Sequence, residues 1–274
     1  MARNYYYLVA GLPELVMEHG RKEFDVCALR DEVRELISPA DYKLVEQLFL
    51  PFDNENLLNA LLGRGMQNSP LGTLPAEVFA DLEGHAELMP AYMQQFYCSY
   101  TEATAEEQSK HPELQLMEAF YAQALRSKNP FLKQWFAFNR DLNNILTAIN
   151  CRRMGIEVAG QLLGDGPIVE ALQRSQAADF GLRQEVDYID RLVQIAELPD
   201  VAERERRIDM LRWEMANELT TWDYFNVNFI LAFFAKSIIL QRWAAIDGQQ
   251  GAGMFDKLFA DLKASFSIEQ AFAK

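Results

Sequence analysis

The chain contains few of the residues from which metal centres and disulfide frameworks are built. It has three cysteines and three histidines among its 274 residues. Cys27, Cys98 and Cys151 are far apart and odd in number, which indicates reduced thiols in a cytoplasmic protein, without a disulfide framework or a metal-binding spacing. None of the histidines lies three residues after a glutamate, as the Glu-x-x-His pairs of metal-binding helical bundles require. We therefore expect neither a bound metal nor a cofactor.

Basic residues are also outnumbered. The chain has 26 lysines and arginines against 40 aspartates and glutamates, which gives a formal net charge of −14. Proteins that bind duplex nucleic acid normally carry a basic surface, so we expect no nucleic-acid partner. The acidic excess favours solubility and steers basic partners toward the chain.

Apolar runs are short. The most hydrophobic segment, residues 225–240, includes Asn226, Asn228, Lys236 and Ser237. It is shorter than the span of about 20 apolar residues that crosses a membrane, so we interpret it as a buried core helix. The N-terminal segment carries one positive charge and too short an apolar run for a signal peptide. These features predict a soluble protein that does not span a lipid bilayer.

No catalytic pattern is apparent in the sequence. The turn at residues 164–167 lacks the lysine and the spacing of a phosphate-binding loop. Asp187 and Asp190 share a predicted helix face, as metal-binding aspartates do in helical terpenoid synthases. The neighbouring Arg183 and Arg191 favour an ion-paired, solvated face instead. We predict no catalytic residue and no enzymatic activity, and an all-α enzyme acting on an isoprenoid or phosphorylated substrate through the two aspartates is the catalytic alternative.

Apolar periodicity predicts helices along most of the chain, and therefore an all-α fold. Residues 5–10 are the exception, because their aromatic and β-branched composition fits either a short strand or the apolar first turn of a helix that begins near Pro13. Ser38 is expected to cap a helix that has Pro39 at its first position, and residues 51–53 are expected to break that helix. The predicted helices cover residues 24–37, 42–50, 75–88, 90–100, 113–127, 131–154, 168–175, 181–197, 200–220 and the segment that runs to 246, with an amphipathic tail at 255–266.

What the sequence does contain is one pattern that occurs three times. Each copy predicts an amphipathic helix with an arginine near its end and a glycine just past it. The copies are residues 53–65, 141–155 and 233–248. Their arginines, Arg64, Arg152 and Arg242, are 88 and 90 residues apart. Near-equal spacing of this kind predicts structural repeats.

We therefore predict one all-helical domain, residues 1–274, with approximate internal repeats at 1–75, 76–165 and 166–274. Such repeats are typical of a scaffold with pseudo-threefold shape. The arginines at the helix ends, including Arg153 beside Arg152, have two possible roles. Either they compensate the negative end of the helix dipole, or they form a ring of similarly placed basic groups on one side of the scaffold.

The repeats and their surroundings resemble a known family. The aromatic segment 225–237, which leads into Ala-Lys, resembles the closing segment of the central-stalk subunit that is named C in V/A-type rotary ATPases and d in eukaryotic V-ATPases. The helix at 141–155 and the turn at 162–167 resemble the corresponding parts of that stalk protein. The opening, residues 5–13, resembles a bacterial family of unknown function associated with V-type ATPase operons. The chain departs from the stalk protein in its shorter length and in Ser237, where an acidic residue is usual.

The resemblance implies a funnel-shaped, non-catalytic central-stalk protein made of three similar lobes. Such a protein sits on the cytoplasmic face of the membrane rotor ring and receives the end of the central axle. It transmits torque for ATP-coupled ion transport, and it is held at the inner membrane by protein partners. The residues that would line its contact surfaces are Asn56, Arg64, Asn144, Arg152, Arg153, Lys236 and Arg242. The alternative is a free-standing helical adaptor or regulatory interaction protein.

Overall fold

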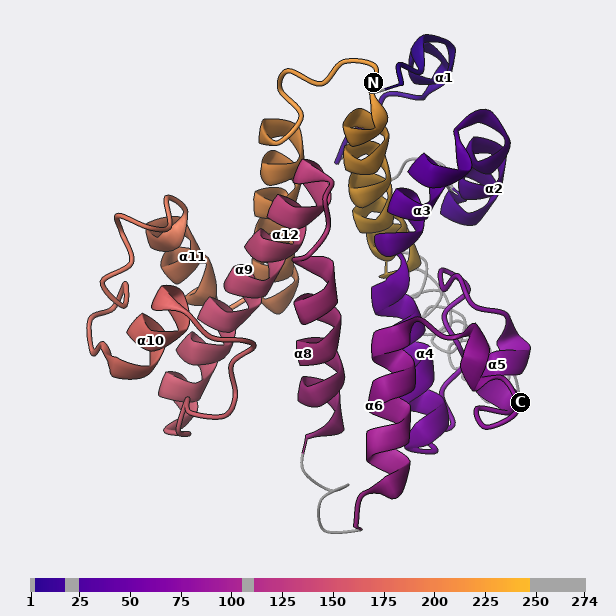
Figure 1. The fold of residues 1–274 in the computed structure, drawn as a ribbon. Coiled ribbons are helices and arrows are strands. Elements are labelled where there is room, and N and C mark those ends of the chain that lie inside the picture. Colours follow the sequence, from indigo (N-terminus) through magenta and orange to yellow (C-terminus); the bar gives the residue numbers. More distant parts are fainter. Residues whose placement is uncertain (1–2, 18–24, 105–110, 247–274) are drawn as a thin grey trace, which may run out of the picture.

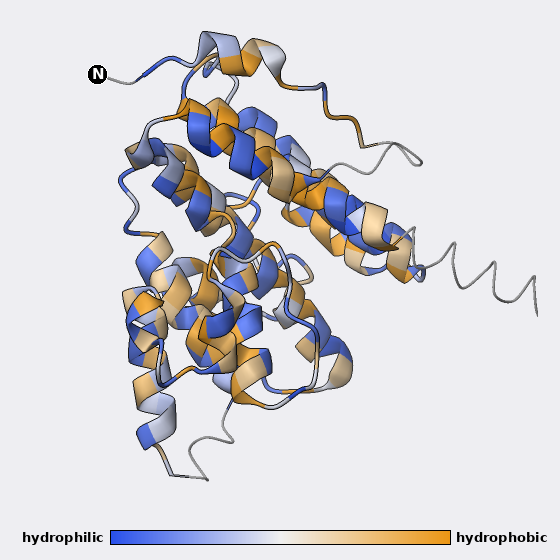
Figure 2. Ribbon diagram, turned by 90° about the vertical axis from the view of Figure 1, so that its right-hand side faces the viewer, coloured by the Kyte–Doolittle hydropathy of each residue, from blue (hydrophilic) through white to orange (hydrophobic). Residues whose placement is uncertain are grey.

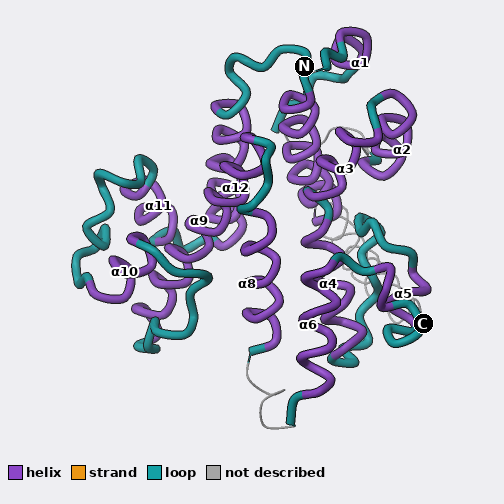
Figure 3. The backbone as a smooth tube through the Cα atoms, in the orientation of Figure 1, coloured by secondary structure: helices purple, strands orange, loops and turns teal. Residues whose placement is uncertain are grey.

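The computed structural model describes residues 3–17, 25–104 and 111–246. All regular elements in these residues are helices and none is a strand, so the predicted all-α class is confirmed (Figures 1 and 3). The loop predicted at 248–253 and the amphipathic tail predicted at 255–266 lie outside the described residues. The helices are α1 (Tyr6–Gly11), α2 (Val26–Leu36), α3 (Pro39–Gln47), α4 (Leu50–Leu61), α5 (Ala76–Ala80), the short 3₁₀ helix η1 (Ala86–Leu88), α6 (Ala91–Glu102), α8 (Pro112–Ala124), α9 (Pro130–Met154), α10 (Pro167–Arg174), α11 (Ile189–Ala196), α12 (Val201–Glu218) and a C-terminal helix, Val227–Ile246.

Several helix starts follow from local chemistry. Ser38 caps α3, its hydroxyl accepting a hydrogen bond from the backbone N–H of Asp41, and Pro39 lies in the first turn, as predicted. Asn129 caps α9 in the same way by accepting from the N–H of Leu132. The predicted helix break at residues 51–53 is wrong. Pro51 lies instead in the first turn of α4, where a missing backbone N–H breaks no intrahelical hydrogen bond.

Three other predicted elements differ from the structure. The N-terminal aromatic segment is the helix α1, so the strand alternative is wrong. The helix also ends at Gly11 and does not begin near Pro13, because residues 13–17 are not helical. The helix predicted at 75–88 is divided into α5 and η1, because Asp81 ends α5 and its carboxylate accepts a hydrogen bond from the N–H of Gly84. The helix predicted at 181–197 begins only at Ile189, since Phe180 and Gly181 both have positive φ and start a series of turns.

Buried apolar residues form two clusters. The first packs α2, α3, α4, α6, α8 and the C-terminal helix around Phe49, Phe120 and Phe234. The second packs α10, α11 and α12 around Leu142 and Ile145 of α9. The 25-residue helix α9 contributes to both clusters and joins them. In Figure 1, α10 and α11 lie on one side of α9, and α4, α5 and α6 lie on the other.

The C-terminal helix is the most apolar element. Among the described residues, Val227–Ile246 is a helix that has the length and the composition needed to cross a membrane. Its residues 230–235 are buried, and all of them except Phe233 belong to the first cluster, where the Phe234 ring lies 5.8 Å from that of Phe49. Figure 2 shows hydrophobic residues interleaved with hydrophilic ones along the packed helices. The burial of this segment is what the sequence predicts for a core helix.

Candidate interaction site

The first copy of the repeated pattern fixes a loop to α4. Asn56 is buried, and its side-chain amide pairs with both backbone groups of Ser69. Its Nδ2 donates to the carbonyl of Ser69 over 3.1 Å, and its Oδ1 accepts from the N–H of Ser69 over 2.7 Å. We call this arrangement, one asparagine amide paired with both backbone groups of one loop residue, an amide clamp. It holds the glycine-rich loop that follows α4 against the helix.

Asp53, one turn earlier on α4, holds the next part of the same loop. Its carboxylate accepts from the backbone N–H of Thr73 at 2.9 Å, from the hydroxyl of Thr73 at 2.7 Å and from the N–H of Leu74 at 3.1 Å. Burial raises the pKa of Asp53, and these hydrogen bonds offset part of the rise. The loop approaches so closely that a Cβ on Gly72 would lie 2.5 Å from Oδ1 of Asp53, which explains the glycine there.

The second copy contains the same clamp. Asn144 on α9 lies 88 residues after Asn56 and is also buried. Its Nδ2 donates to the carbonyl of Leu163 over 2.9 Å, and its Oδ1 accepts from the N–H of Leu163 over 2.8 Å. The first two copies therefore share one structure, in which a helix is followed by a loop and an asparagine amide of the helix binds the backbone of that loop.

The third copy differs from the other two. The residue 90 positions after Asn144 is Phe234, whose side chain packs in the first apolar cluster. In the part of the chain that the structure describes, the amide clamp therefore occurs in two copies. The predicted division into repeats at 1–75, 76–165 and 166–274 stays a prediction.

The arginines that end the first two copies both make contacts within the chain. Arg64 forms an ion pair with Glu113 at the start of α8. Arg152 donates to the backbone carbonyls of Ser175 and Ala177, each over 2.8 Å, and its guanidinium lies 4.0 Å from the centroid of the Phe180 ring. Its neighbour Arg153 donates to the carbonyl of Ala196. Arg152 and Arg153 thus tie the loop after α10 and the end of α11 to the end of α9.

The two predicted residues on the C-terminal helix both contact α12. Lys236 donates through Nζ to Oδ1 of Asn217 over 3.0 Å, and burial lowers the pKa of Lys236. Arg242 forms ion pairs with Glu205 and Asp209. The seven predicted residues do not form one site, because Asn56 and Asn144 are buried and the basic residues are bound to separate parts of the chain: α8, the loop after α10, the end of α11 and α12. Their role toward a partner stays a prediction.

Asp209 is the centre of a buried network that the sequence did not reveal. It is 1% exposed, and it accepts from Arg212 over 2.8 Å and from Nε1 of Trp243 over 2.8 Å in addition to Arg242. Arg212 also donates to Asn139 of α9 over 3.1 Å. The network joins α9, α12 and the C-terminal helix. The sequence signal for it was an aspartate between the apolar residues 208 and 210.

A groove of about 450 Å³ lies between α9, α12 and residues 185–191. We call it the acidic groove, because its lining holds five carboxylates and one cation, Arg191, which donates two hydrogen bonds to Glu214. The carboxylates are those of Asp141, Glu185, Asp187, Glu214 and Glu218. Burial raises the pKa of Asp141, although the adjacent Arg140, which is ion-paired with it, acts in the opposite direction. Half-buried apolar side chains of Ile168, Met215 and Leu219 share the lining.

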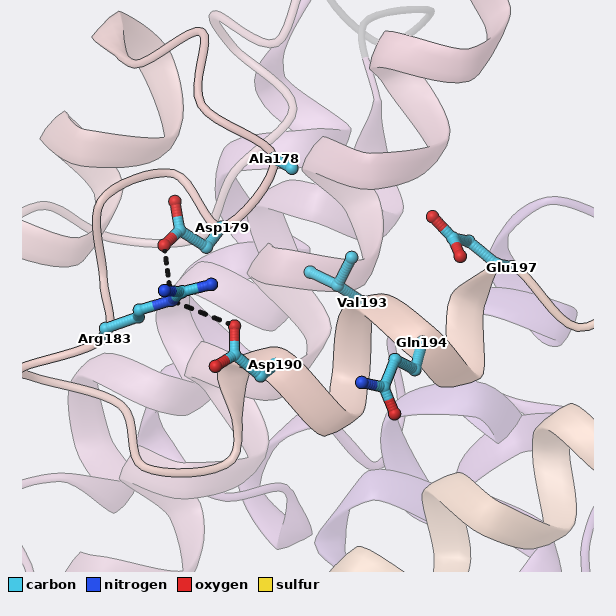
Figure 4. A pocket seen from close by; sticks show the side chains of 7 residues that line it. All are labelled: Ala178, Asp179, Arg183, Asp190, Val193, Gln194 and Glu197. Carbon is cyan, nitrogen blue, oxygen red and sulfur yellow. Dashed lines mark hydrogen bonds and ion pairs between the residues drawn. The ribbon is translucent and has the colours of Figure 1, made fainter.

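A second hollow of similar volume lies beside α11 (Figure 4). Within it, the guanidinium of Arg183 bridges Asp179 at 2.9 Å and Asp190 at 3.1 Å. Asp187 lines the acidic groove instead, so the two aspartates considered for metal chemistry face different hollows. In residues 3–17, 25–104 and 111–246, no group of three or more histidine, cysteine, aspartate or glutamate side chains is placed to hold a metal ion.

Two segments that touch each other, α1 and the loop before the C-terminal helix, both carry exposed aromatic side chains. Tyr7 is 91% exposed and Trp222 is 84% exposed, with Tyr6 and Tyr224 also exposed. The Tyr6 ring lies 4.7 Å from that of Phe225, and the backbone N–H of Tyr5 donates to the carbonyl of Phe225 over 2.6 Å. We call this surface, residues 6, 7, 222, 224 and 225, the aromatic patch. Isolated exposed aromatics are common, whereas several of them on two adjoining segments are typical of an interaction site.

Comparison with known proteins gives one match. The sequence model of a protein family described as "Protein of unknown function (DUF2764)" matches residues 1–266, and the chain therefore belongs to this family. No curated protein and no solved structure matches the chain.

Proposed function

We propose that this member of the DUF2764 family is a non-catalytic, helical central-stalk component of a V/A-type rotary ATPase. In this proposal it joins the central axle to the membrane rotor ring and transmits torque for ATP-coupled ion transport. It lies on the cytoplasmic face and is held at the inner membrane through these protein partners. Its three repeats form a funnel, in which the C-terminal helix is the third and most divergent copy.

The observation that carries the proposal is the amide clamp that recurs after 88 residues. A duplicated helix and loop supports the internal repetition that the resemblance to the C/d stalk protein implies. Each clamp also satisfies both backbone groups of a loop residue from a buried side chain, which fixes the loop rigidly to its helix. Rigid connections of this kind suit a part that passes torque between two others.

The aromatic patch supports a role in assembly. Tyrosine and tryptophan supply large contact areas with little loss of side-chain freedom, and they dominate many protein interfaces. The backbone hydrogen bond between Tyr5 and Phe225 holds the two parts of the patch together before any partner arrives. The patch therefore suits a permanent neighbour in a complex.

The test is affinity capture of the tagged protein from gently solubilised native membranes, followed by mass spectrometry. We expect the axle and catalytic subunits of a rotary ATPase in stoichiometric amounts. A variant with Tyr7→Ser and Trp222→Ser should lose most of this capture. A matched variant with Met66→Ser and Leu88→Ser, which changes exposed apolar residues elsewhere, should retain it. Recovery of the protein alone, while an intact rotary complex is found separately, would contradict the proposal.

A free-standing helical adaptor is the second candidate function. The observation that favours it is the loss of the clamp at Phe234, which leaves two equivalent helix–loop units in the described chain. An adaptor needs no threefold form. The adaptor function would be favoured if the protein captured one defined partner that is not a rotary ATPase component. That capture should show the same dependence on Tyr7 and Trp222.

A further inference from the structure

We propose that the acidic groove binds a basic amphipathic segment of a partner protein. The segment would place apolar side chains against the groove floor and lysine or arginine side chains against its carboxylates. The inference goes beyond the proposed function, since it holds whether or not the partner belongs to a rotary ATPase.

The shape of the groove suits a short helical segment. Its lining runs along α9 from Gln134 to Asp141 and along α12 from Leu211 to Leu219. At 1.5 Å per residue these stretches are about 10 and 12 Å long, or roughly two helical turns each. A groove between two helices receives a partner helix through side chains spaced three or four residues apart.

The floor of the groove is apolar and adaptable. Ile168, Met215 and Leu219 are half-buried, so each retains apolar surface that a partner can cover. Met215 lies on the α12 side, and the flexibility of methionine lets it adjust to different apolar partners. The ring of Tyr188 packs edge-on against Phe138 at 5.0 Å, and both side chains belong to the lining.

The rim of the groove specifies the charge of the partner. Glu185, Asp187 and Glu218 are exposed. In the part of the chain that the structure describes, none of these three carboxylates forms an ion pair, and Arg191 is bound to Glu214. Three carboxylates of like charge around one groove repel each other, and a basic ligand relieves that repulsion. The net charge of −14 steers the same ligand toward the protein.

The combination of floor and rim favours a protein segment over other cationic surfaces and ligands. An anionic bilayer would be repelled by the rim. A small polyamine would satisfy the carboxylates but leave the apolar floor exposed to water. A basic amphipathic helix covers both.

The binding assay uses the full-length protein and a fluorescein-labelled synthetic helix of about 18 residues, five turns long, made of leucine on one face and lysine on the other. Fluorescence anisotropy at physiological salt gives its Kd. A rim variant carries Glu185→Gln, Asp187→Asn and Glu218→Gln. We expect its Kd to rise at least about tenfold, because the change removes the charges that face the ligand.

A matched control separates the groove from the general charge of the protein. It carries Asp31→Asn, Glu32→Gln and Glu35→Gln, which remove the same number of charges from exposed positions of α2. Its Kd should rise less than about twofold, since screening weakens the effect of distant surface charges. Equal weakening in the rim variant and in this control would overturn the proposal.

A third variant, Ala137→Trp, fills the groove without changing its charge. It tests whether the peptide binds in the groove even if the rim variant fails to fold. We expect it to weaken peptide binding by about tenfold or more. Unchanged binding in a folded Ala137→Trp protein would overturn the proposal. Full displacement of the peptide by spermine at equal charge concentration would also overturn it, in favour of a small-cation site. No component of a rotary ATPase takes part in this assay, so its failure is distinct from failure of the membrane capture.

Discussion

α4 and α9 are each followed by a loop that an asparagine of the helix holds in the same way. The aspartate one turn before that asparagine differs in its contacts between the two helices. Asp53 turns inward and accepts hydrogen bonds from Thr73 and Leu74. Asp141, which also lies 88 residues later, pairs with the adjacent Arg140 and lines the acidic groove. The clamp position is therefore structural in both units, whereas the aspartate position is structural in one and faces a binding surface in the other.

The difference shows how a repeated unit gains a surface of its own. In the first unit, Gly72 lets the loop lie against Asp53 and close the space above the helix. In the second unit Asn144 is hydrogen-bonded to the loop, and Leu162 and Leu163 of the loop are buried in the apolar clusters. Asp141 lines the groove that α9 forms with α12 and residues 185–191. Because the second loop is held without the aspartate, Asp141 is available to line a groove.

The largest effect is expected from loss of either clamp. Asn56→Ala and Asn144→Ala should each lower the free energy of unfolding by about 3 kcal/mol, because a buried N–H and a buried carbonyl lose their partner. Urea denaturation followed by circular dichroism measures this. Asn150→Ala, at an exposed position of α9, is the control and should change stability by less than about 0.5 kcal/mol. Near-equal stability of all three variants would show that the clamps are dispensable.

Substitution of Asp53 on α4 and of Asp141 on α9 should change the free energy of unfolding by different amounts. Asp53→Ala is expected to lower the free energy of unfolding by about 2 kcal/mol, since Thr73 and Leu74 lose an acceptor, partly offset by removal of a carboxyl whose pKa burial raises. Asp141→Ala should lower it by less than about 1 kcal/mol, because burial raises the pKa of this carboxyl and so disfavours its charged form, and the change should weaken binding of the basic peptide. The same urea titration and the anisotropy assay measure the two effects. A larger stability loss in Asp141→Ala would reverse the assignment.

A smaller contrast is expected between the arginines of the first two copies, Arg64 in the loop after α4 and Arg152 in the last turn of α9. Arg152→Ala should cost about 1 kcal/mol, because two backbone carbonyls and the Phe180 ring lose a contact. Arg64→Ala should cost less than about 0.5 kcal/mol, since its pair with Glu113 is partly exposed. Thermal unfolding of both variants beside the wild type tests the order. Equal shifts would show that the contacts of Arg152 stabilise the fold no more than a surface pair.

The smallest effect concerns pH and the C-terminal helix. Burial lowers the pKa of Lys236 below its ordinary value of 10.5, so the unfolded chain binds more protons than the folded chain just below that value. The contribution of Lys236 to the free energy of unfolding should therefore rise as pH increases through this window. The free energy of unfolding of the wild type minus that of Lys236→Met, measured in urea from about pH 8 to about pH 10.5, should increase with pH. A constant difference would contradict the desolvation of this lysine.

Most of the helices, and the likeness of the first two copies of the repeated pattern, could be predicted from the amino-acid sequence. Ser38 with Pro39, and Asn129 with Pro130, start helices through contacts that span only a few residues, so their effect is visible in the sequence. The spacing of 88 residues between Arg64 and Arg152 also separates Asn56 from Asn144, and the structure shows that these two asparagines make equivalent contacts. Local signals failed at Pro51 and at residues 181–188, where the same residue types are compatible with more than one backbone path.

What the equivalent side chains do depends on tertiary packing, which the sequence pattern does not reveal. Asp53 and Asp209 accept hydrogen bonds from residues of other segments, and Asp141 lines a groove that other segments complete. A sequence pattern does not specify which segment will pack beside each aspartate. The acidic groove exists because α9, α12 and residues 185–191 meet at one place. Packing of apolar faces brings these segments together, and the polar groups then pair with whatever lies within hydrogen-bonding distance.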